Sequence, residues 1–131
     1  MNYDGRMDRQ CIPLCDAINS IPGLVTACSC CGHGRESFLL WFHLSDRKKI
    51  RFLTVIGRVF DRRYGGLEGW SCYLDNCDVP KSCPSFRIDS GNIKGAKAYG
   101  DSIKIAENIY EHLKHPAFSR AFLKRNPETA A

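Results

Sequence analysis

Three cysteines and one histidine lie within six residues, in the segment Cys28-Ser29-Cys30-Cys31-Gly32-His33. Gly34 follows, so the histidine stands between two glycines. This pattern is typical of a tight turn whose backbone N–H groups can approach a bound group. Thiol and imidazole groups there can bind a metal ion, act as a nucleophile and its base, or pack without further chemistry.

Zinc binding is the first of these uses, because tetrahedral zinc favours sulfur and imidazole ligands. The candidate ligands within the segment are Cys28, Cys30, Cys31 and His33. A further ligand would come from elsewhere in the chain: His43, Cys72, Cys77 or Cys83. Structural zinc sites usually separate two cysteines by two residues, whereas one intervening residue on a strand places both thiols on one face, about 6–7 Å apart. The spacing departs from the usual zinc pattern, so zinc stays an open option and no cofactor is assigned.

A catalytic pair is the second use. Cys30 or Cys31 beside His33 could form a thiolate and an imidazolium. The sequence identifies no third group that would orient the histidine, so no catalytic residue is assigned.

Anion binding by the turn is the simplest functional interpretation. Gly32 and Gly34 would expose backbone N–H groups at the end of a strand, and His33 and Arg35 would add side-chain donors. Such a turn can hold a phosphate or a carboxylate.

The positive charge of the chain is local. Residues 46–63 contain seven Lys and Arg against two Asp, a net +5 that equals the charge of the whole chain. We expect a helix from Asp46, as N-cap, through Phe60, with this apolar stripe: Ile50, Leu53, Gly57 and Phe60. At about 100° per residue, four arginines fall within a sector of roughly 60°. They are Arg47, Arg51, Arg58 and Arg62. Aligned arginines repel one another, which favours an anionic ligand beside them.

Aromatic side chains near this segment could stack on a base. We expect Tyr64 or Trp70 to do so for a nucleotide-like ligand. Nucleic acid would use the same basic stripe with Trp41, Phe42, Tyr64 or Trp70. A net charge of +5 is modest for a general nucleic-acid binder, so a small nucleotide is the preferred ligand.

The elements that would position these residues form an α+β fold. The patterns predict helices over residues 13–20, 46–60 and 94–115, and strands over residues 24–30, 37–44, 69–74 and 85–89. The 24–30 and 37–44 strands form a hairpin, and residues 118–123 form a short final helical turn. We expect one domain over residues 1–131, with residues 1–7 and 126–131 flexible. Its four-stranded, mostly antiparallel sheet carries about three helices packed on one face. The other face is open to a ligand or to a second copy of the chain, and we expect a homo-oligomer.

Composition agrees with a globular protein. The chain has 131 residues, 44% of them hydrophobic, enough for a core. It contains no apolar run of about 18 residues and no hydrophobic leader, so we expect a cytoplasmic protein with no membrane partner. In that compartment the eight cysteines are expected to be thiols or metal ligands rather than disulfides.

Most of the chain resembles a known family. Asn19, Pro22 and Thr26 precede the cysteine segment, and Asp61-Arg62-Arg63-Tyr64 and Gly69-Trp70 follow it. This pattern, over about residues 11–118, resembles a family of small uncharacterised proteins from phages and prophages of Gram-positive bacteria. The family has no assigned activity. The resemblance implies an accessory protein in the cytosol of a bacterial host.

A shorter likeness covers about 15 residues. The tRNA wybutosine-synthesis methyltransferase family has a Thr-x-Ser-Ser-Cys-Ser-Gly-Arg turn, and residues 28–33 lie over its last six positions. The chain differs at Cys28, Cys31 and His33. This resemblance implies an RNA-modifying or methyl-transferring enzyme that uses the Cys-Cys-Gly-His turn.

Three functions follow from these observations. The preferred one is binding of an anionic, nucleotide-derived molecule, in line with sequestration by a phage of a host antiviral-defence signal such as a cyclic nucleotide or a cyclic ADP-ribose relative. The expected ligand-binding residues are His33, Arg35, Arg47, Arg51, Arg58, Arg62, Tyr64 and Trp70. The alternatives are the RNA-modifying enzyme and a zinc-stabilised protein-interaction module.

Overall fold

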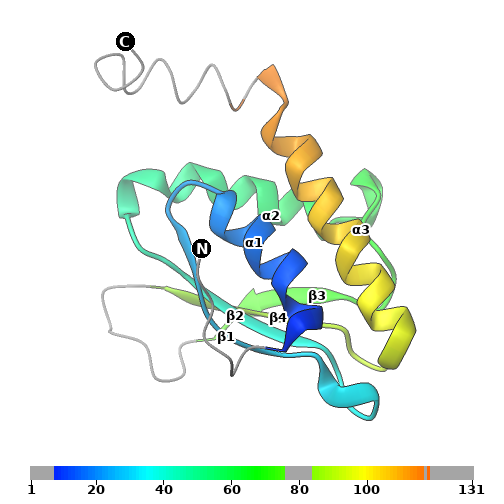
Figure 1. The fold of residues 1–131 in the computed structure, drawn as a ribbon. Coiled ribbons are helices and arrows are strands. Elements are labelled where there is room, and N and C mark those ends of the chain that lie inside the picture. Colours follow the sequence, from blue (N-terminus) through cyan, green and yellow to red (C-terminus); the bar gives the residue numbers. More distant parts are fainter. Residues whose placement is uncertain (1–7, 76–83, 117, 119–131) are drawn as a thin grey trace.

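The computed structural model describes residues 8–75, 84–116 and 118. Four antiparallel strands form one sheet in the order β1-β2-β4-β3, and three α-helices lie over one face of it (Figure 1). The strands are β1 (Leu24–Cys30), β2 (Leu39–Leu44), β3 (Ser71–Leu74) and β4 (Ser85–Asp89). The helices are α1 (Ile12–Ser20), α2 (Leu53–Val59) and α3 (Gly95–Leu113). Short 3-10 segments are η1 (Arg9–Cys11), η2 (Gly32–Gly34), η3 (Arg47–Phe52) and η4 (Arg62–Tyr64). The predicted α+β class is confirmed, and every strand pair is antiparallel.

Some predictions fall on residues that lie outside the described ranges. They concern the flexible ends at 1–7 and 126–131, the possible ligands Cys77 and Cys83, and most of the final helical turn.

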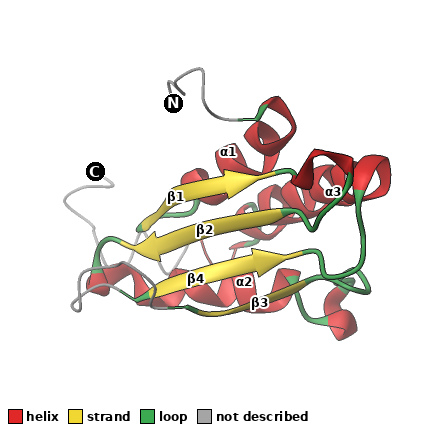
Figure 2. Ribbon diagram, turned by 90° about the horizontal axis from the view of Figure 1, so that it is seen from below, coloured by secondary structure: helices red, strands yellow, loops and turns green. Residues whose placement is uncertain are grey.

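The central strand β2 separates the two faces of the sheet by simple alternation. Leu40, Phe42 and Leu44 are at most 1% exposed and face the helices. Trp41 and His43, between them, are half-buried on the opposite face. Figure 2 shows the strands in front of the helices, so that no described helix covers this second face. The predicted open face is therefore present in the part of the chain that the structure describes.

Helix α1 is tied to β1 by a reciprocal pair of hydrogen bonds. The Asn19 side-chain amide donates to the Thr26 hydroxyl at 3.0 Å, and the Thr26 backbone N–H donates to the Asn19 amide oxygen at 2.9 Å. Pro13 lies in the first turn of α1, where no backbone donor is needed. Asn19 and Thr26 are thus spaced to join the helix to the strand that leads to the Gly-His-Gly turn.

The predicted helix over residues 46–60 is divided, and its predicted apolar stripe is formed only in part: Leu53 and Phe60 pack against the core, but Ile50 does not. Asp46 caps it by accepting the Lys48 N–H at 2.9 Å, but η3 runs to Phe52 before α2 begins. A 3-10 segment turns about 120° per residue rather than about 100°, which changes the face that each side chain occupies. Ile50 is consequently 58% exposed. The buried positions are Phe52, Val55, Ile56 and Val59.

Helix α3 buries a carboxylate that the sequence pattern did not reveal. Asp101 is 4% exposed, and it accepts the Trp70 indole N–H at 3.0 Å and the Lys97 ammonium at 3.3 Å. Tyr110, near the other end of this helix, is 40% exposed. Within the described residues, no helix is both long and apolar enough to span a membrane.

The Asp101 contacts give a test of the core. Asp101→Ala leaves the Trp70 N–H buried without an acceptor, so we expect the free energy of unfolding to fall by about 2–4 kcal/mol. Urea denaturation measures it. Glu107→Ala, on the exposed side of the same helix, is the control and should change stability by about 0.5 kcal/mol or less. Equal losses in the two variants would contradict the assigned role of Asp101.

Candidate functional site

The Gly-His-Gly turn has an unusual backbone. Gly32, His33 and Gly34 have φ angles of 81°, 52° and 81°, so three consecutive residues lie in the left-handed region. A Cβ on Gly32 would lie 2.8 Å from the Ser37 carbonyl oxygen, which makes glycine necessary there. His33 is the one described residue other than glycine with a positive φ. Such backbone costs about 1–2 kcal/mol for an L-residue. The imidazole is therefore held in place at an energetic cost.

Asp8 completes a group of three side chains at this turn. Its carboxylate accepts the Cys31 backbone N–H at 3.2 Å and lies 3.8 Å from the His33 Nε2 atom. The Cys31 Sγ atom lies 4.0 Å from His33 Nδ1. One sulfur, one ring nitrogen and one carboxylate oxygen lie within 4.8 Å of one another. Asp8 stands 23 residues before Cys31, and no local sequence spacing relates the two, so sequence reasoning missed it.

The surroundings of Cys31 do not favour a nucleophile. The residue is 9% exposed and belongs to the hydrophobic core. Burial raises the pKa of the Cys31 thiol, and the Asp8 carboxylate raises it further, although a hydrogen bond from the His33 backbone acts in the opposite direction. A catalytic cysteine needs a lowered pKa and access to its substrate. The geometry of this group suits ligation better than nucleophilic attack.

The other predicted zinc ligands lie elsewhere. Cys28 is exposed on β1 opposite Trp41, and Cys30 accepts the Gly32 N–H at 3.4 Å. Among the described residues, the group of potential ligands at the turn includes Cys31 and His33 but neither Cys28 nor Cys30. The six described cysteines are free thiols.

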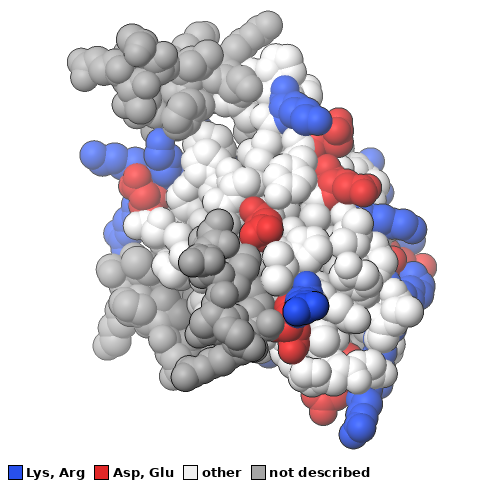
Figure 3. Space-filling model, viewed as in Figure 1, with Lys and Arg blue, Asp and Glu red and all other residues white. Residues whose placement is uncertain are grey.

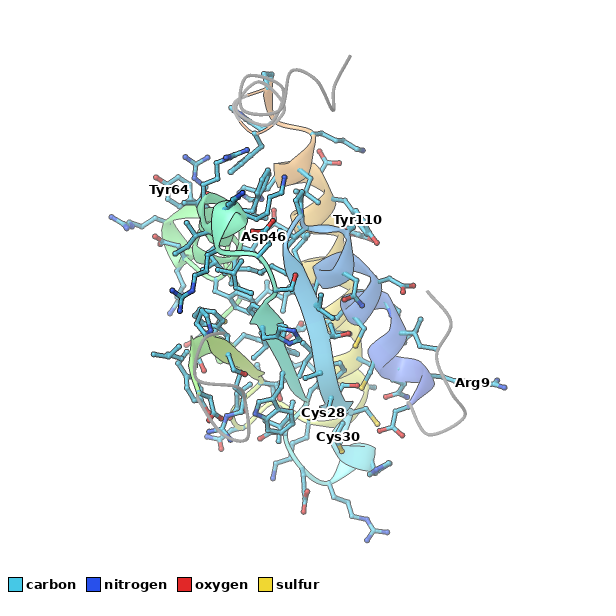
Figure 4. The ribbon with its side chains drawn as sticks, turned by 90° about the vertical axis from the view of Figure 1, so that its left-hand side faces the viewer. Arg9, Cys28, Cys30, Asp46, Tyr64 and Tyr110 are labelled. Atoms are coloured by element: carbon cyan, nitrogen blue, oxygen red, sulfur yellow. The ribbon has the colours of Figure 1, made fainter. Side chains whose placement is uncertain are left out.

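The turn and the arginine-rich segment lie at opposite ends of β1. Figure 4 places Cys30, the last residue of β1, at one end of the strand, and Asp46 and Tyr64 toward the other end. A strand of seven residues spans about 20 Å. His33 and Arg35 therefore do not converge with the predicted arginines into one site.

The arginines themselves are spread over three elements. Arg47 and Arg51 lie in η3, Arg58 in α2 and Arg62 in η4. Arg51 is half-buried, with its guanidinium 4.8 Å from the centre of the Phe52 ring. In the view of Figure 3, Lys and Arg side chains lie at several separate places over the face and its edges rather than in one patch. The single arginine stripe of the sequence analysis is not formed, because η3 is not α-helical.

Arg58 and Tyr64 do lie together, at the end of α2, and Arg62 stands two residues before Tyr64 in η4. The Arg58 guanidinium lies 5.8 Å from the centre of the Tyr64 ring and 5.5 Å from that of Phe118. Tyr64 is 56% exposed. Beside it is a hollow of about 280 Å³ between η4 and α3, which we call the Tyr64 pocket. Its lining residues are Val59, Tyr64, Gly65, Leu67, Lys104, Ile105 and Asn108.

The other aromatic candidates are already engaged. Trp70 is 6% exposed, and the centre of its ring lies 5.6 Å from that of Phe38. Its indole N–H donates a hydrogen bond to Asp101. Phe42 is fully buried. On the open face of the sheet, the Trp41 N–H donates to Asp75 at 3.3 Å. Of the four predicted stacking residues, Tyr64 is the one with its ring largely exposed.

A larger hollow, of about 460 Å³, lies between α2 and the edge strand β3. Its lining is mostly apolar and includes Leu53, Ile56, Phe60 and Cys72. No lining residue carries a positive charge, so this hollow does not suit a phosphate. Its lining includes the half-buried Cys72 thiol, and partial burial raises the pKa of Cys72 to about 12.

The Gly-His-Gly turn gives a stability test. His33→Gly removes the cost of a left-handed L-residue, and the greater chain entropy of glycine offsets part of it. We therefore expect the free energy of unfolding to rise by about 0.5–1 kcal/mol. Thermal and urea denaturation measure the change. Arg35→Gly is the control, because Arg35 has a negative φ of −111° and should only lose stability. A loss in His33→Gly would show that the imidazole contacts outweigh the strain.

The Cys72 thiol gives a pH test. Above the ordinary thiol pKa of 9.0 the unfolded chain releases this proton, while the folded chain keeps it up to about pH 12. Stability should therefore fall as pH rises above 9, by about 1.4 kcal/mol per pH unit from this group. Cys72→Val keeps a similar volume and should show a shallower decline in urea denaturation between pH 9 and 11. Parallel profiles for the two proteins would contradict the burial of this thiol.

Comparison with known proteins adds no assignment to this geometry. No protein-family model matches the chain, and no significant similarity is found to a curated protein or to a solved structure. The resemblances to a phage family and to a methyltransferase family therefore stay predictions. Function has to be inferred from the two groups of residues at the two ends of β1.

Proposed function

We propose that the protein binds an anionic, nucleotide-derived small molecule at the Tyr64 pocket. The observation that carries the proposal is an exposed aromatic ring at one hollow, with one cationic side chain in the lining and a guanidinium over the ring. Tyr64 and Lys104 line the pocket, Arg58 lies over the Tyr64 ring, and Arg62 stands two residues before it.

Each group matches one part of a nucleotide. The exposed face of Tyr64 suits stacking on a base, a contact worth about 1–3 kcal/mol in single-stranded nucleic-acid sites. Arg58 and Arg62 present planar guanidinium groups, which suit bidentate contacts with phosphate oxygens. The Asn108 amide offers both a donor and an acceptor to the edge of a base.

Neighbouring charges leave this basic character largely intact. Arg63 is paired with Asp61 at 2.8 Å, and this contact lowers the pKa of the Asp61 carboxyl. Arg62 lies 4.0 Å from Glu68, with both side chains well exposed, and such a pair contributes little. An incoming phosphate can therefore compete for Arg62 at small cost.

The pocket favours binding over turnover. Its described lining contains no cysteine, histidine or carboxylate that could act as a nucleophile or general base. A volume of about 280 Å³ accommodates a base and part of a sugar, with the phosphates left at the rim near the arginines. Sequestration of a signal molecule, such as a cyclic nucleotide or a cyclic ADP-ribose relative, is consistent with this arrangement. The phage role and the oligomeric state stay predictions.

Direct binding measurements test the proposal. Isothermal titration calorimetry with cyclic AMP, cyclic di-AMP and cyclic ADP-ribose should detect binding of at least one of them. Arg62→Glu should weaken that binding by about tenfold or more, because one favourable charge contact becomes a repulsive one. Tyr64→Leu should weaken it through loss of stacking.

Arg9→Glu is the matched control, since Arg9 is also exposed but lies away from Tyr64 (Figure 4). It makes the same change in net charge and should leave the affinity within about twofold, apart from screened long-range attraction. Equal affinities of wild type and Arg62→Glu would exclude the Tyr64 pocket as the site. No binding of any probe by the wild type would contradict the proposed ligand class.

A further inference from the structure

We infer that Asp8, Cys31 and His33 bind one divalent transition-metal ion of the zinc type. This site is separate from the Tyr64 pocket, at the other end of β1. It differs from the zinc site considered from the sequence, because it uses Asp8 in place of Cys28 and Cys30.

The donor atoms match the preferences of zinc. Zinc in proteins is bound by cysteine sulfur, histidine nitrogen and carboxylate oxygen, and this group supplies one of each. In a tetrahedral site, adjacent donor atoms lie about 3.4–3.6 Å apart, as follows from metal–ligand lengths of about 2.0–2.3 Å. The Asp8 carboxylate lies 3.8 Å from His33 Nε2 and the Cys31 Sγ atom lies 4.0 Å from Nδ1, and with one donor atom taken from each residue all three lie within 4.8 Å of one another. Small side-chain rotations would bring the donors into ligand geometry.

The histidine can supply either ring nitrogen. Its Nδ1 atom faces the Cys31 sulfur and its Nε2 atom faces the Asp8 carboxylate, so one nitrogen binds the ion and the other remains outside the first coordination shell. A buried thiol becomes a ligand because the metal displaces its proton. Cys31 therefore loses a proton to solvent on binding, and the thiolate and the Asp8 carboxylate together balance the two positive charges of the ion.

A backbone hydrogen bond holds one of the three proposed ligands in position. The Cys31 N–H donates to the Asp8 carboxylate at 3.2 Å, which orients one ligand before any ion arrives. His33 has a left-handed φ, and its two ring nitrogens face Asp8 and Cys31, although 69% of the side chain stays exposed. Three protein ligands and an exposed histidine leave the fourth position open to water. This is the arrangement of a reactive rather than a purely structural zinc ion.

An ordinary ion pair is the competing explanation. A protonated His33 beside Asp8 would account for their 3.8 Å contact, but an exposed pair of this kind contributes little stability. It would not account for a buried cysteine sulfur on the other side of the same ring. Metal titration separates the two explanations, since an ion pair creates no cobalt–thiolate bond.

Cobalt is the probe for this site. The full chain is treated with a chelator, freed of it, and titrated with Co²⁺ under reducing conditions. Wild type should show a thiolate-to-cobalt charge-transfer band and tetrahedral visible bands, and Zn²⁺ should abolish both by displacement. His33→Gly should weaken Co²⁺ and Zn²⁺ binding by about tenfold or more, because it removes one of three ligands. This variant is suited to the test because its fold is expected to be stabilised rather than lost. Asp8→Asn should weaken binding as well.

Two controls match these variants. Glu36→Gln removes an exposed carboxylate close to the same turn, and Cys28→Ser removes an exposed thiol from β1. Both should retain the charge-transfer band and the wild-type affinity. The inference is overturned if wild type shows no such band, if His33→Gly binds both ions as tightly as wild type, or if Cys28→Ser abolishes the band. Arg62→Glu should lose nucleotide affinity and still bind the metal ion. His33→Gly should lose metal affinity and still bind the nucleotide.

Discussion

The alternation of side chains on β2 is the constraint on which the structure depends. Leu40, Phe42 and Leu44 point into the core, and their burial decides which face of the sheet the helices cover. Burying a side chain of this size contributes about 1.5–3 kcal/mol, so a shift of one residue in register would be costly. Because β2 pairs with both β1 and β4, its register also fixes where the β1–β2 hairpin turns.

The hairpin keeps two kinds of chemistry apart. Its turn carries sulfur, imidazole and carboxylate groups around a strained backbone. Its open end leads through η3 and α2 to guanidinium groups and an exposed tyrosine. Oxygen-rich anions and transition-metal ions require different surroundings, and a separation of about 20 Å would let the two proposed ligands bind without interference. Helix α3 contacts both η2 and α2, so it packs against both ends of the molecule that carry these groups.

Sequence reasoning predicted the elements with strong local signals. Strands β1 and β4, the capping role of Asp46 and the proline start of α1 were all predicted from neighbouring residues. It failed at η3, because hydrophobic spacing does not distinguish a 3-10 start from an α-helix and the two place Ile50 on different faces. The ends of α3 were predicted to within two residues, but its exposed Tyr110 was not.

The candidate sites show the same limit. Arg58, Arg62 and Tyr64 are close in the chain, so the local sequence was enough to predict them as candidate ligand-binding residues. Asp8 and Asp101 accept hydrogen bonds from residues 23 or more positions away in the chain, namely Cys31 and Trp70. Such contacts depend on how α1 and α3 pack on the sheet, and a single sequence carries no direct signal of that packing. Trp70 was expected at a ligand, but its indole completes the core instead.

The most direct test of the two-site account is an amide chemical-shift map of the assigned, isotope-labelled full chain. The spectrum would be recorded with the tightest-binding cyclic nucleotide and, in a second sample, with Zn²⁺. The account predicts that the nucleotide shifts amides around Arg58, Gly65 and Asn108, while Zn²⁺ shifts those of Cys31 to Gly34. The account would be contradicted if the nucleotide shifted the Gly-His-Gly turn instead, or if neither ligand moved its assigned end of the hairpin.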